Sequence, residues 1–221
     1  MTTIQYIRDY TTLSSMTADI IENTMKTTPD HTNLGLPTGN TPLGLYQQLR
    51  KKNLNWTNTR TFNLDEYINI TPDNPASFNY YMQEQLHMHT DIPKKNIFFP
   101  TLTPHYDTTI HNYGGLNLII LGLGHNGHIA FNEPGSTIDS TTRIVDLSIQ
   151  TREDNGKHNP CPKQAITMGI ATILDTKHAI LLAQGLRKLQ ILKQALWHTI
   201  TPNIPASYLQ LHKNLQVLYC D

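Results

Sequence analysis

The stretch LNLIILGLGHNGHIAFNEPGS, residues 116–136, decides the fold of this chain, because a short apolar run passes directly into a glycine-rich turn. An apolar run of this length, bounded by glycines, is typical of a central strand in a parallel sheet that is covered on both faces. Open α/β sheets place their chemistry at the carboxyl ends of such strands. We therefore predict a functional site just after Leu121, in the turn that carries His128 and Glu133.

Segments of strand and helix character alternate on both sides of this strand. Strand patterns occupy residues 4–7, 32–36, 60–64, 96–99, 116–121, 143–147, 179–183 and 215–219. Helical patterns occupy residues 13–25, 43–49, 77–87, 104–113, 166–174 and 186–197, with a short helical turn after residue 205. This alternation predicts an α/β fold with an open, mostly parallel, doubly wound (Rossmann-like) sheet and helices on both of its faces.

Size and composition favour one domain spanning residues 1–221, since no linker, repeat or low-complexity tract interrupts the chain. Seventeen basic and seventeen acidic side chains give a formal net charge of zero, so no overall field attracts nucleic acid or an acidic membrane. The first residues do not resemble a leader, and no apolar run is long enough to span a bilayer. Cys161 and Cys220 lack disulfide-framework and metal-ligand spacing. We expect a cytoplasmic protein that holds any anionic ligand in a local pocket.

A turn of sequence PTGNTP, residues 37–42, follows the strand at residues 32–36 directly. We predict that Thr41 caps the following helix and that Pro42 is its first residue. Backbone amides, two hydroxyls and the positive end of the helix dipole then converge, which favours an anion and above all a phosphate. An ordinary capped turn explains these residues alone equally well.

Two successive carboxylates, Asp65 and Glu66, end the strand at residues 60–64. Because side chains alternate along a strand, one carboxylate is expected to face the pocket while the other has a structural role. A partly desolvated carboxylate at this place has a raised pKa, which suits it to move a proton to and from carbon. The alternative is a solvated acidic turn.

The glycines at residues 122–127 match the G-x-G-x-x-G fingerprint, and Asp146 lies near the distance expected of a ribose-binding acid. A dinucleotide site requires a helix directly after the third glycine. Pro134 and Gly135 interrupt any helix there, so we regard a dinucleotide site as a minor alternative. An imidazole titrates near neutrality, and the placement of His128 after a buried strand favours it over His125 as an acid or base.

Four motifs, LGLPTGNTPLGLY, TFNLDEY, LGLGHNGHIAFNEPGS and AITMGIATILD, occur in this order. The chain closely resembles the glucosamine-6-phosphate deaminase (isomerase) family, from about residue 30 to its end. The resemblance implies conversion of glucosamine 6-phosphate and water into fructose 6-phosphate and ammonia in amino-sugar catabolism, with no metal and no organic cofactor. The related 6-phosphogluconolactonases share the fold but differ in the DEY and HIAFNEP segments.

The resemblance also assigns the catalytic residues. Asp65 matches the general base that carries a proton from C2 to C1 of the open-chain sugar, His128 matches the ring-opening catalyst, and Glu133 is its partner acid. Asn126 stands where many relatives have aspartate. We expect its amide to accept a hydrogen bond from the imidazole N–H, leaving His128 less basic than in those relatives, while Glu133 supplies the charge that keeps the enzyme active.

The phosphate ligands implied by the resemblance are Thr38, Gly39, Asn40, Thr41, Lys157 and Lys188. Lys188 begins a helix, so its charge adds to the helix dipole. Lys157 aligns with an arginine of the family, and a point charge in place of a bidentate fork is expected to weaken the hold on phosphate.

Other departures concern regulation and assembly. The chain stops at Asp221 without the tail of the long, allosteric members, and Val145 replaces one of their lysines although Arg143 matches. We therefore expect no activation by N-acetylglucosamine 6-phosphate. Short members are often monomeric and long ones hexameric, which leaves a monomer or a homo-oligomer open. The stretch at residues 99–106 is several residues shorter than usual.

Two alternative functions remain at this point. One is a 6-phosphogluconolactonase-like hydrolase, which ammonia release would exclude. The other is a non-catalytic sugar-phosphate sensor of the same fold. Such sensors accompany a DNA-binding helix-turn-helix, for which the residues before Thr32 are too few and too weakly basic.

Overall fold

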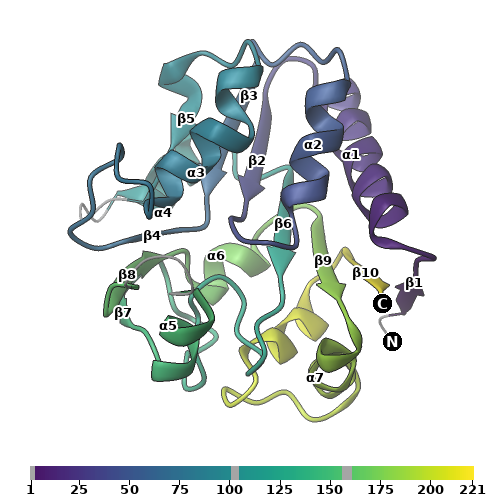
Figure 1. The fold of residues 1–221 in the computed structure, drawn as a ribbon, viewed down its shortest axis with the longest axis vertical. Coiled ribbons are helices and arrows are strands. Elements are labelled where there is room, and N and C mark those ends of the chain that lie inside the picture. Colours follow the sequence, from purple (N-terminus) through teal and green to yellow (C-terminus); the bar gives the residue numbers. More distant parts are fainter. Residues whose placement is uncertain (1–2, 101–104, 156–160) are drawn as a thin grey trace.

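A seven-stranded sheet forms the centre of the computed structural model, which describes residues 3–100, 105–155 and 161–221. Its strand order is β1-β10-β9-β6-β2-β3-β5, and all neighbouring strands run parallel (Figure 1). The strands are β1 (Ile4–Tyr6), β2 (Thr32–Leu36), β3 (Thr59–Asn63), β5 (Ile97–Phe98), β6 (Leu118–Gly122), β9 (Ala179–Gln184) and β10 (Leu215–Cys220). The first and last of these, β1 and β10, pair with each other, which brings the two ends of the chain together.

Helices cover both faces of this sheet, as the sequence predicts. One face packs against α1 (Tyr10–Thr27), α2 (Leu43–Lys51), α3 (Phe78–Gln85) and the turn η1 (His87–His89). The other packs against α4 (Tyr106–Asn112), α6 (Ile170–Leu174), α7 (Leu186–Trp197) and the turn η3 (Pro205–Leu211). A further turn, η2 (Lys94–Asn96), precedes β5.

The run that opens the sequence analysis is β6, and it lies at the middle of the sheet between β9 and β2. Leu118 and Ile120 belong to the core on the α1 side, whereas Ile119 and Leu121 belong to the core on the α7 side. All four are fully buried. A strand covered on both faces needs apolar side chains in both directions, which explains the uninterrupted run.

A second sheet, which the sequence analysis does not predict, adjoins the first. Its order is β4-β8-β7, with antiparallel pairs, and its strands are β4 (Asp65–Tyr67), β7 (Arg143–Asp146) and β8 (Gln164–Thr167). The helix predicted at residues 166–174 is therefore wrong in its first half. Ile166, Ile170 and Ile173 have helical spacing, but a Cβ at Gly169 would lie 2.1 Å from a backbone oxygen of Ser140, where the chain turns between β8 and α6.

Two further helices differ from expectation. The helix α5 (Ile149–Asn155) is not predicted. The helix α2 begins one residue late, with Pro42 at its cap position and no side-chain cap, so the prediction that Thr41 caps it is wrong. Part of the helix predicted at 104–113, and part of the shortened stretch at 99–106, lies outside the described residues. Within the described chain, no helix has both the length and the apolar character needed to cross a membrane.

Candidate active site

A cleft of about 260 Å³ opens where the carboxyl ends of β2, β3 and β6 meet. Its walls also include residues of α5 and α7. Of the residues proposed from the sequence, the cleft brings together Thr38, Gly39, Asn40, Thr41, Asp65, His128 and Lys188. Asn126 and Glu133 contact the segment that carries His128. Lys157 lies outside the described residues.

The turn at residues 37–42 forms one wall of the cleft and leads into the amino end of α2. Gly39 has a φ of 102°, a left-handed conformation that favours glycine, and a Cβ there would meet nothing within 4 Å. The hydroxyl of Thr41 does not cap α2, so it is available to a ligand. The turn therefore offers amides and hydroxyls to the cleft next to the positive end of the helix.

Lys188 approaches the same cleft from the first turn of α7. Its Nζ donates a hydrogen bond to the carbonyl oxygen of Leu123 at 2.5 Å. Burial lowers the pKa of Lys188, and the nearby carboxylate of Asp154 acts against that shift. A half-buried ammonium held by a carbonyl, in the same cleft as the turn before α2, favours an anion.

Asp65 and Glu66 have the opposite roles that strand alternation predicts. Asp65 lines the cleft with 6% of its surface exposed. Burial raises the pKa of Asp65 to about 8, and the charge of Glu66 adds to the shift. Glu66 faces α3 instead, where its carboxylate accepts hydrogen bonds from the amides of Phe78 and Asn79 and from the hydroxyl of Ser77. The first carboxylate is thus available to a ligand, and the second anchors a helix.

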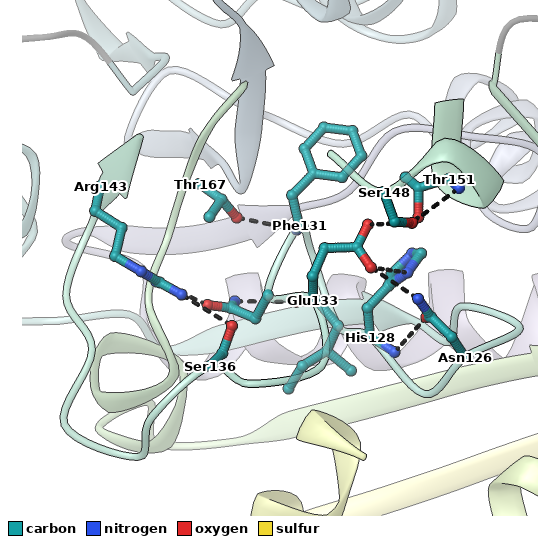
Figure 2. Close-up of polar contacts among 11 residues, drawn as sticks. Asn126, His128, Phe131, Glu133, Ser136, Arg143, Ser148, Thr151 and Thr167 are labelled. Atoms are coloured by element: carbon teal, nitrogen blue, oxygen red, sulfur yellow. Dashed lines mark hydrogen bonds and ion pairs between the residues drawn. The ribbon is translucent and has the colours of Figure 1, made fainter. Parts of the chain in front are cut away.

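The carboxylate of Glu133 lies between His128, Asn126 and Ser148 (Figure 2). Its Oε2 is 4.0 Å from Nδ1 of His128 and accepts a hydrogen bond of 2.7 Å from Nδ2 of Asn126. Its Oε1 accepts from the hydroxyl of Ser148 at 3.3 Å. Burial lowers the pKa of His128, while the charge of Glu133 acts in the opposite direction.

The expected contact between the Asn126 amide and the imidazole is wrong. Oδ1 of Asn126 accepts from the backbone N–H of His128 at 3.1 Å, and its Nδ2 donates to Glu133. Both ends of the amide are engaged within the loop, and Nδ1 of His128 has no hydrogen-bond partner among the described residues. Asn126 therefore orients Glu133, and Glu133 is the group that approaches the imidazole.

The glycines of residues 122–127 have local reasons that are unrelated to a dinucleotide. A Cβ at Gly124 would lie 2.4 Å from the His128 ring, so this glycine makes room for the imidazole. Gly127 has a φ of 84°, and a Cβ there would meet Ile204 at 2.7 Å. The next described helix after β6 is α5, far beyond the third glycine. These features disfavour the dinucleotide alternative.

Several residues that line the cleft are absent from the sequence-based set. Thr151, Asp154 and Asn155 lie on α5, spaced three and four apart on one helical face. This spacing is the sequence feature that could have indicated a polar helix face lining the cleft. Phe78 and Phe131 stack with ring centroids 5.7 Å apart and close another side of the cleft. Among residues 3–100, 105–155 and 161–221, no group of three or more His, Cys, Asp or Glu side chains could hold a metal ion.

Known proteins similar to this chain share its length and fold. A glucosamine-6-phosphate deaminase of Geobacillus sp. (strain WCH70) is 42% identical over 226 residues, which cover 95% of this chain and 90% of that protein. The solved structure of a monomeric glucosamine-6-phosphate deaminase is 36% identical, with a TM-score of 0.95 over 100% of this chain and 97% of the other. A 6-phosphogluconolactonase of Thermotoga maritima, 23% identical with a TM-score of 0.80 over 100% of this chain and 99% of the other, shares the fold.

The family comparison covers nearly all of the chain. Residues 9–218 match the family model described as glucosamine-6-phosphate isomerases/6-phosphogluconolactonase. The matched segment contains the turn at residues 37–42, Asp65, the His128 loop and Lys188, all of which contribute to one cleft or its support. The chain therefore belongs to the glucosamine-6-phosphate isomerase/6-phosphogluconolactonase family.

Proposed function

We propose that this chain is a glucosamine-6-phosphate deaminase, which converts glucosamine 6-phosphate and water into fructose 6-phosphate and ammonia. One observation carries the proposal: a single cleft combines an anion-binding turn and Lys188 with a buried carboxylate and an imidazole. The identity of 42% with a deaminase, against 23% with a lactonase structure, supports this activity over lactone hydrolysis.

The phosphate binds at the turn of residues 38–41, with Lys188 as its counter-charge. Amide N–H groups and the ammonium are charge-assisted donors to phosphate oxygens, and both are held in place before the ligand arrives. We assign Lys157 to the same phosphate as a further point charge. Binding the phosphate fixes one end of the sugar, so its other end reaches Asp65 and His128.

His128 opens the pyranose by moving a proton between the C1 hydroxyl and the ring oxygen. Its lowered pKa keeps the imidazole neutral near pH 7, so the ring can accept a proton at one nitrogen. The imidazolium that forms lies beside the carboxylate of Glu133, whose Oε2 is 4.0 Å from Nδ1. Asn126 and Ser148 hold that carboxylate in place.

Asp65 then carries the proton from C2 to C1 of the open chain. The C2 proton passes to Asp65 while the C1 oxygen gains a proton from solvent, which gives an enolamine; Asp65 then protonates C1 to give the protonated ketimine. Water adds to C2, and loss of ammonia leaves the ketone of fructose 6-phosphate. A base with a pKa of about 8 suits this exchange, because it must both take and return the proton near neutral pH.

The assay that tests this proposal measures ammonia and fructose 6-phosphate together, with 6-phosphogluconolactone hydrolysis as a separate arm. We expect equal amounts of the two products from glucosamine 6-phosphate. Lactone hydrolysis without ammonia release would instead indicate the lactonase alternative, and binding of glucosamine 6-phosphate without turnover would indicate a sensor.

We further propose that the enzyme acts as a monomer in the cytoplasm. The structural relative at 36% identity is described as monomeric, which supports the first point. Both cysteines, Cys161 and Cys220, are free thiols, as a reducing compartment favours. Light scattering of the purified chain tests the assembly state, and a mass near 25.1 kDa is the expected result.

A further inference from the structure

Three tyrosine hydroxyls, each from a different helix, donate hydrogen bonds to carbonyl oxygens of the turn at residues 37–41. Tyr46 of α2 donates to Pro37 at 2.5 Å, and Tyr81 of α3 donates to Gly39 at 2.6 Å. The third hydroxyl, of Tyr10 at the start of α1, donates to the carbonyl of Thr41 at 2.9 Å and lies 3.2 Å from that of Asn40. Nothing in the chemistry proposed above uses these hydroxyls.

The carbonyl oxygens of this turn matter because they belong to the same peptide groups as the amides that face an anion. A carbonyl that turned into the cleft would place partial negative charge next to the phosphate and remove one N–H donor. Gly39 is the place where that rotation is easiest, since its φ of 102° lies in a region that glycine leaves readily. Holding the carbonyls away from the cleft therefore keeps the amides available.

The hydrogen bonds of the turn are consistent with this division. The carbonyls of Pro37, Gly39, Asn40 and Thr41 accept from tyrosine hydroxyls, and that of Asn40 also accepts from the amide of Leu43. The amides of residues 38–41 donate to no residue among those described. A turn in which four of the five carbonyls at residues 37–41 are held by tyrosine hydroxyls, and whose amides at residues 38–41 donate to no described residue, is arranged for an anionic ligand.

We propose that Tyr46 and Tyr81 are positioning residues that preorganise the turn for the phosphate of the substrate. The inference rests on the proposed function for the identity of the phosphosugar, but it applies to any phosphate bound at this turn. The two tyrosines act as a pair, because their rings pack edge to face with centroids 6.3 Å apart.

The two hydroxyls stay donors throughout the working pH range, since burial raises the pKa of Tyr46 and of Tyr81 above the ordinary value of 10.0. Tyr10 is less suitable for a test. Its hydroxyl also accepts a hydrogen bond from the amide of Gly44, so its removal would disturb the first turn of α2 as well.

The experiment removes single hydroxyls and measures phosphate binding directly. Tyr81→Phe is the main variant, Tyr46→Phe the second, and Tyr80→Phe the matched control, because the Tyr80 hydroxyl lies on the same helix and bonds no described residue. Titration calorimetry gives the Kd of inorganic phosphate. Steady-state assays give KM for glucosamine 6-phosphate and kcat.

We expect Tyr81→Phe and Tyr46→Phe each to raise the phosphate Kd and the KM by about three- to tenfold, the loss expected for one hydrogen bond, with a much smaller change in kcat. Tyr80→Phe should change neither constant. A purely structural role would instead lower Tm and kcat while the phosphate Kd of the folded protein stayed constant, and that result would overturn the inference.

The two proposals fail in different ways. If the wild-type protein releases no ammonia but binds inorganic phosphate, and Tyr81→Phe weakens that binding, the proposed function fails and the positioning role stands. If the wild type is a deaminase and Tyr81→Phe, Tyr46→Phe and Tyr80→Phe bind phosphate equally well, the positioning role fails and the proposed function stands.

Discussion

The two sheets of the molecule differ in how they are built and in what they contribute. The seven-stranded sheet is covered on both faces and holds most of the core, whereas β7 of the small sheet is exposed or half-buried along its length, with Ile144 49% exposed. The chain passes from one sheet to the other at Leu64. Its amide donates to Leu36 of the large sheet, and its carbonyl accepts from the amide of Met168, just after β8.

Asp65 is the first residue beyond this crossing. The large sheet fixes where its backbone begins, and the pairing of β4 with β8 fixes where its side chain points, with Asp65 opposite Thr167. The large sheet therefore supplies a rigid edge. The small sheet turns the Asp65 carboxylate into the cleft and the Glu66 carboxylate toward α3.

The largest expected effect comes from Asp65→Asn, which removes the proposed general base where the chain passes between the two sheets and leaves both sheets intact. We expect kcat to fall by about 10²- to 10⁴-fold, the usual contribution of a general base. Binding of the substrate and the Tm should be kept or improved, since a neutral amide is easier to bury than a carboxylate. Loss of folding in this variant would mean that Asp65 holds the two sheets together.

The pH profile is the next largest effect. Asp65 must be deprotonated to act as a base, and its pKa is about 8, so kcat/KM should rise about tenfold per pH unit below that value and level off above it. A profile flat between pH 6 and 8 would contradict the raised pKa of Asp65.

The raised pKa of Asp65 also makes the free energy of unfolding depend on pH. The folded pKa of Asp65 lies above its ordinary value of 3.8, so its contribution to stability is complete below pH 4 and is lost as the pH rises toward 8. The stability gained by Asp65→Asn should therefore grow between pH 5 and pH 8, by more than about 1 kcal/mol in urea unfolding. An equal gain at both pH values would argue against burial of the charge.

Glu66→Gln tests the structural role of the second carboxylate. This change weakens hydrogen bonds from the amides of Phe78 and Asn79 and from Ser77, so we expect a loss of about 1 to 3 kcal/mol and a lower Tm. The kcat of the folded enzyme should change far less than in Asp65→Asn. Equal loss of kcat in both variants would erase the division of roles between the two carboxylates.

A smaller effect is expected from Asn126→Asp, in the loop that follows the large sheet. The aspartate cannot donate to Glu133 and places a second negative charge beside it, while it raises the pKa of His128. We expect kcat/KM to fall by about two- to tenfold. If the variant releases ammonia and the natural protein does not, Asn126 impairs the enzyme and our account of it is wrong.

We expect N-acetylglucosamine 6-phosphate to have no effect on the rate, which is the smallest effect in this series. The guanidinium of Arg143 on β7 is engaged by Oδ1 of Asn132 and the hydroxyl of Ser136, and Val145 offers no second charge (Figure 2). We expect a hyperbolic substrate curve that this compound leaves unchanged. A sigmoidal curve that becomes hyperbolic on its addition would show that the small sheet carries an activator site.

The sequence predicts the large sheet well because its central strands β2, β6 and β9 are short buried runs between turn residues. Strand alternation also predicts that one of Asp65 and Glu66 faces the cleft while the other is structural, and the structure places Asp65 in the cleft. Of the small sheet, only β7 is predicted, as the strand pattern at residues 143–147. The strand β4 has only three residues and shows no period, and Ile166 on β8 continues a helical spacing that tertiary pairing overrides.

The site is predictable to a similar degree. Motif order and strand ends indicate Asp65, His128 and Lys188, all of which line the cleft. The contacts of Asn126 depend on the path of an irregular loop, which no residue pattern fixes. The α5 wall escaped prediction because the helix is short and mostly polar, with Thr151 its only buried residue.

The central claim is that one phosphosugar spans the cleft from the turn at residues 38–41 to Asp65 and His128. A crystal structure of the Asp65→Asn variant with glucosamine 6-phosphate tests it most directly. We predict the phosphate on the amides of the turn and on Lys188, with C1 and C2 between the substituted side chain and His128. A phosphate bound elsewhere, or sugar carbons that reach neither residue 65 nor His128, would contradict the account.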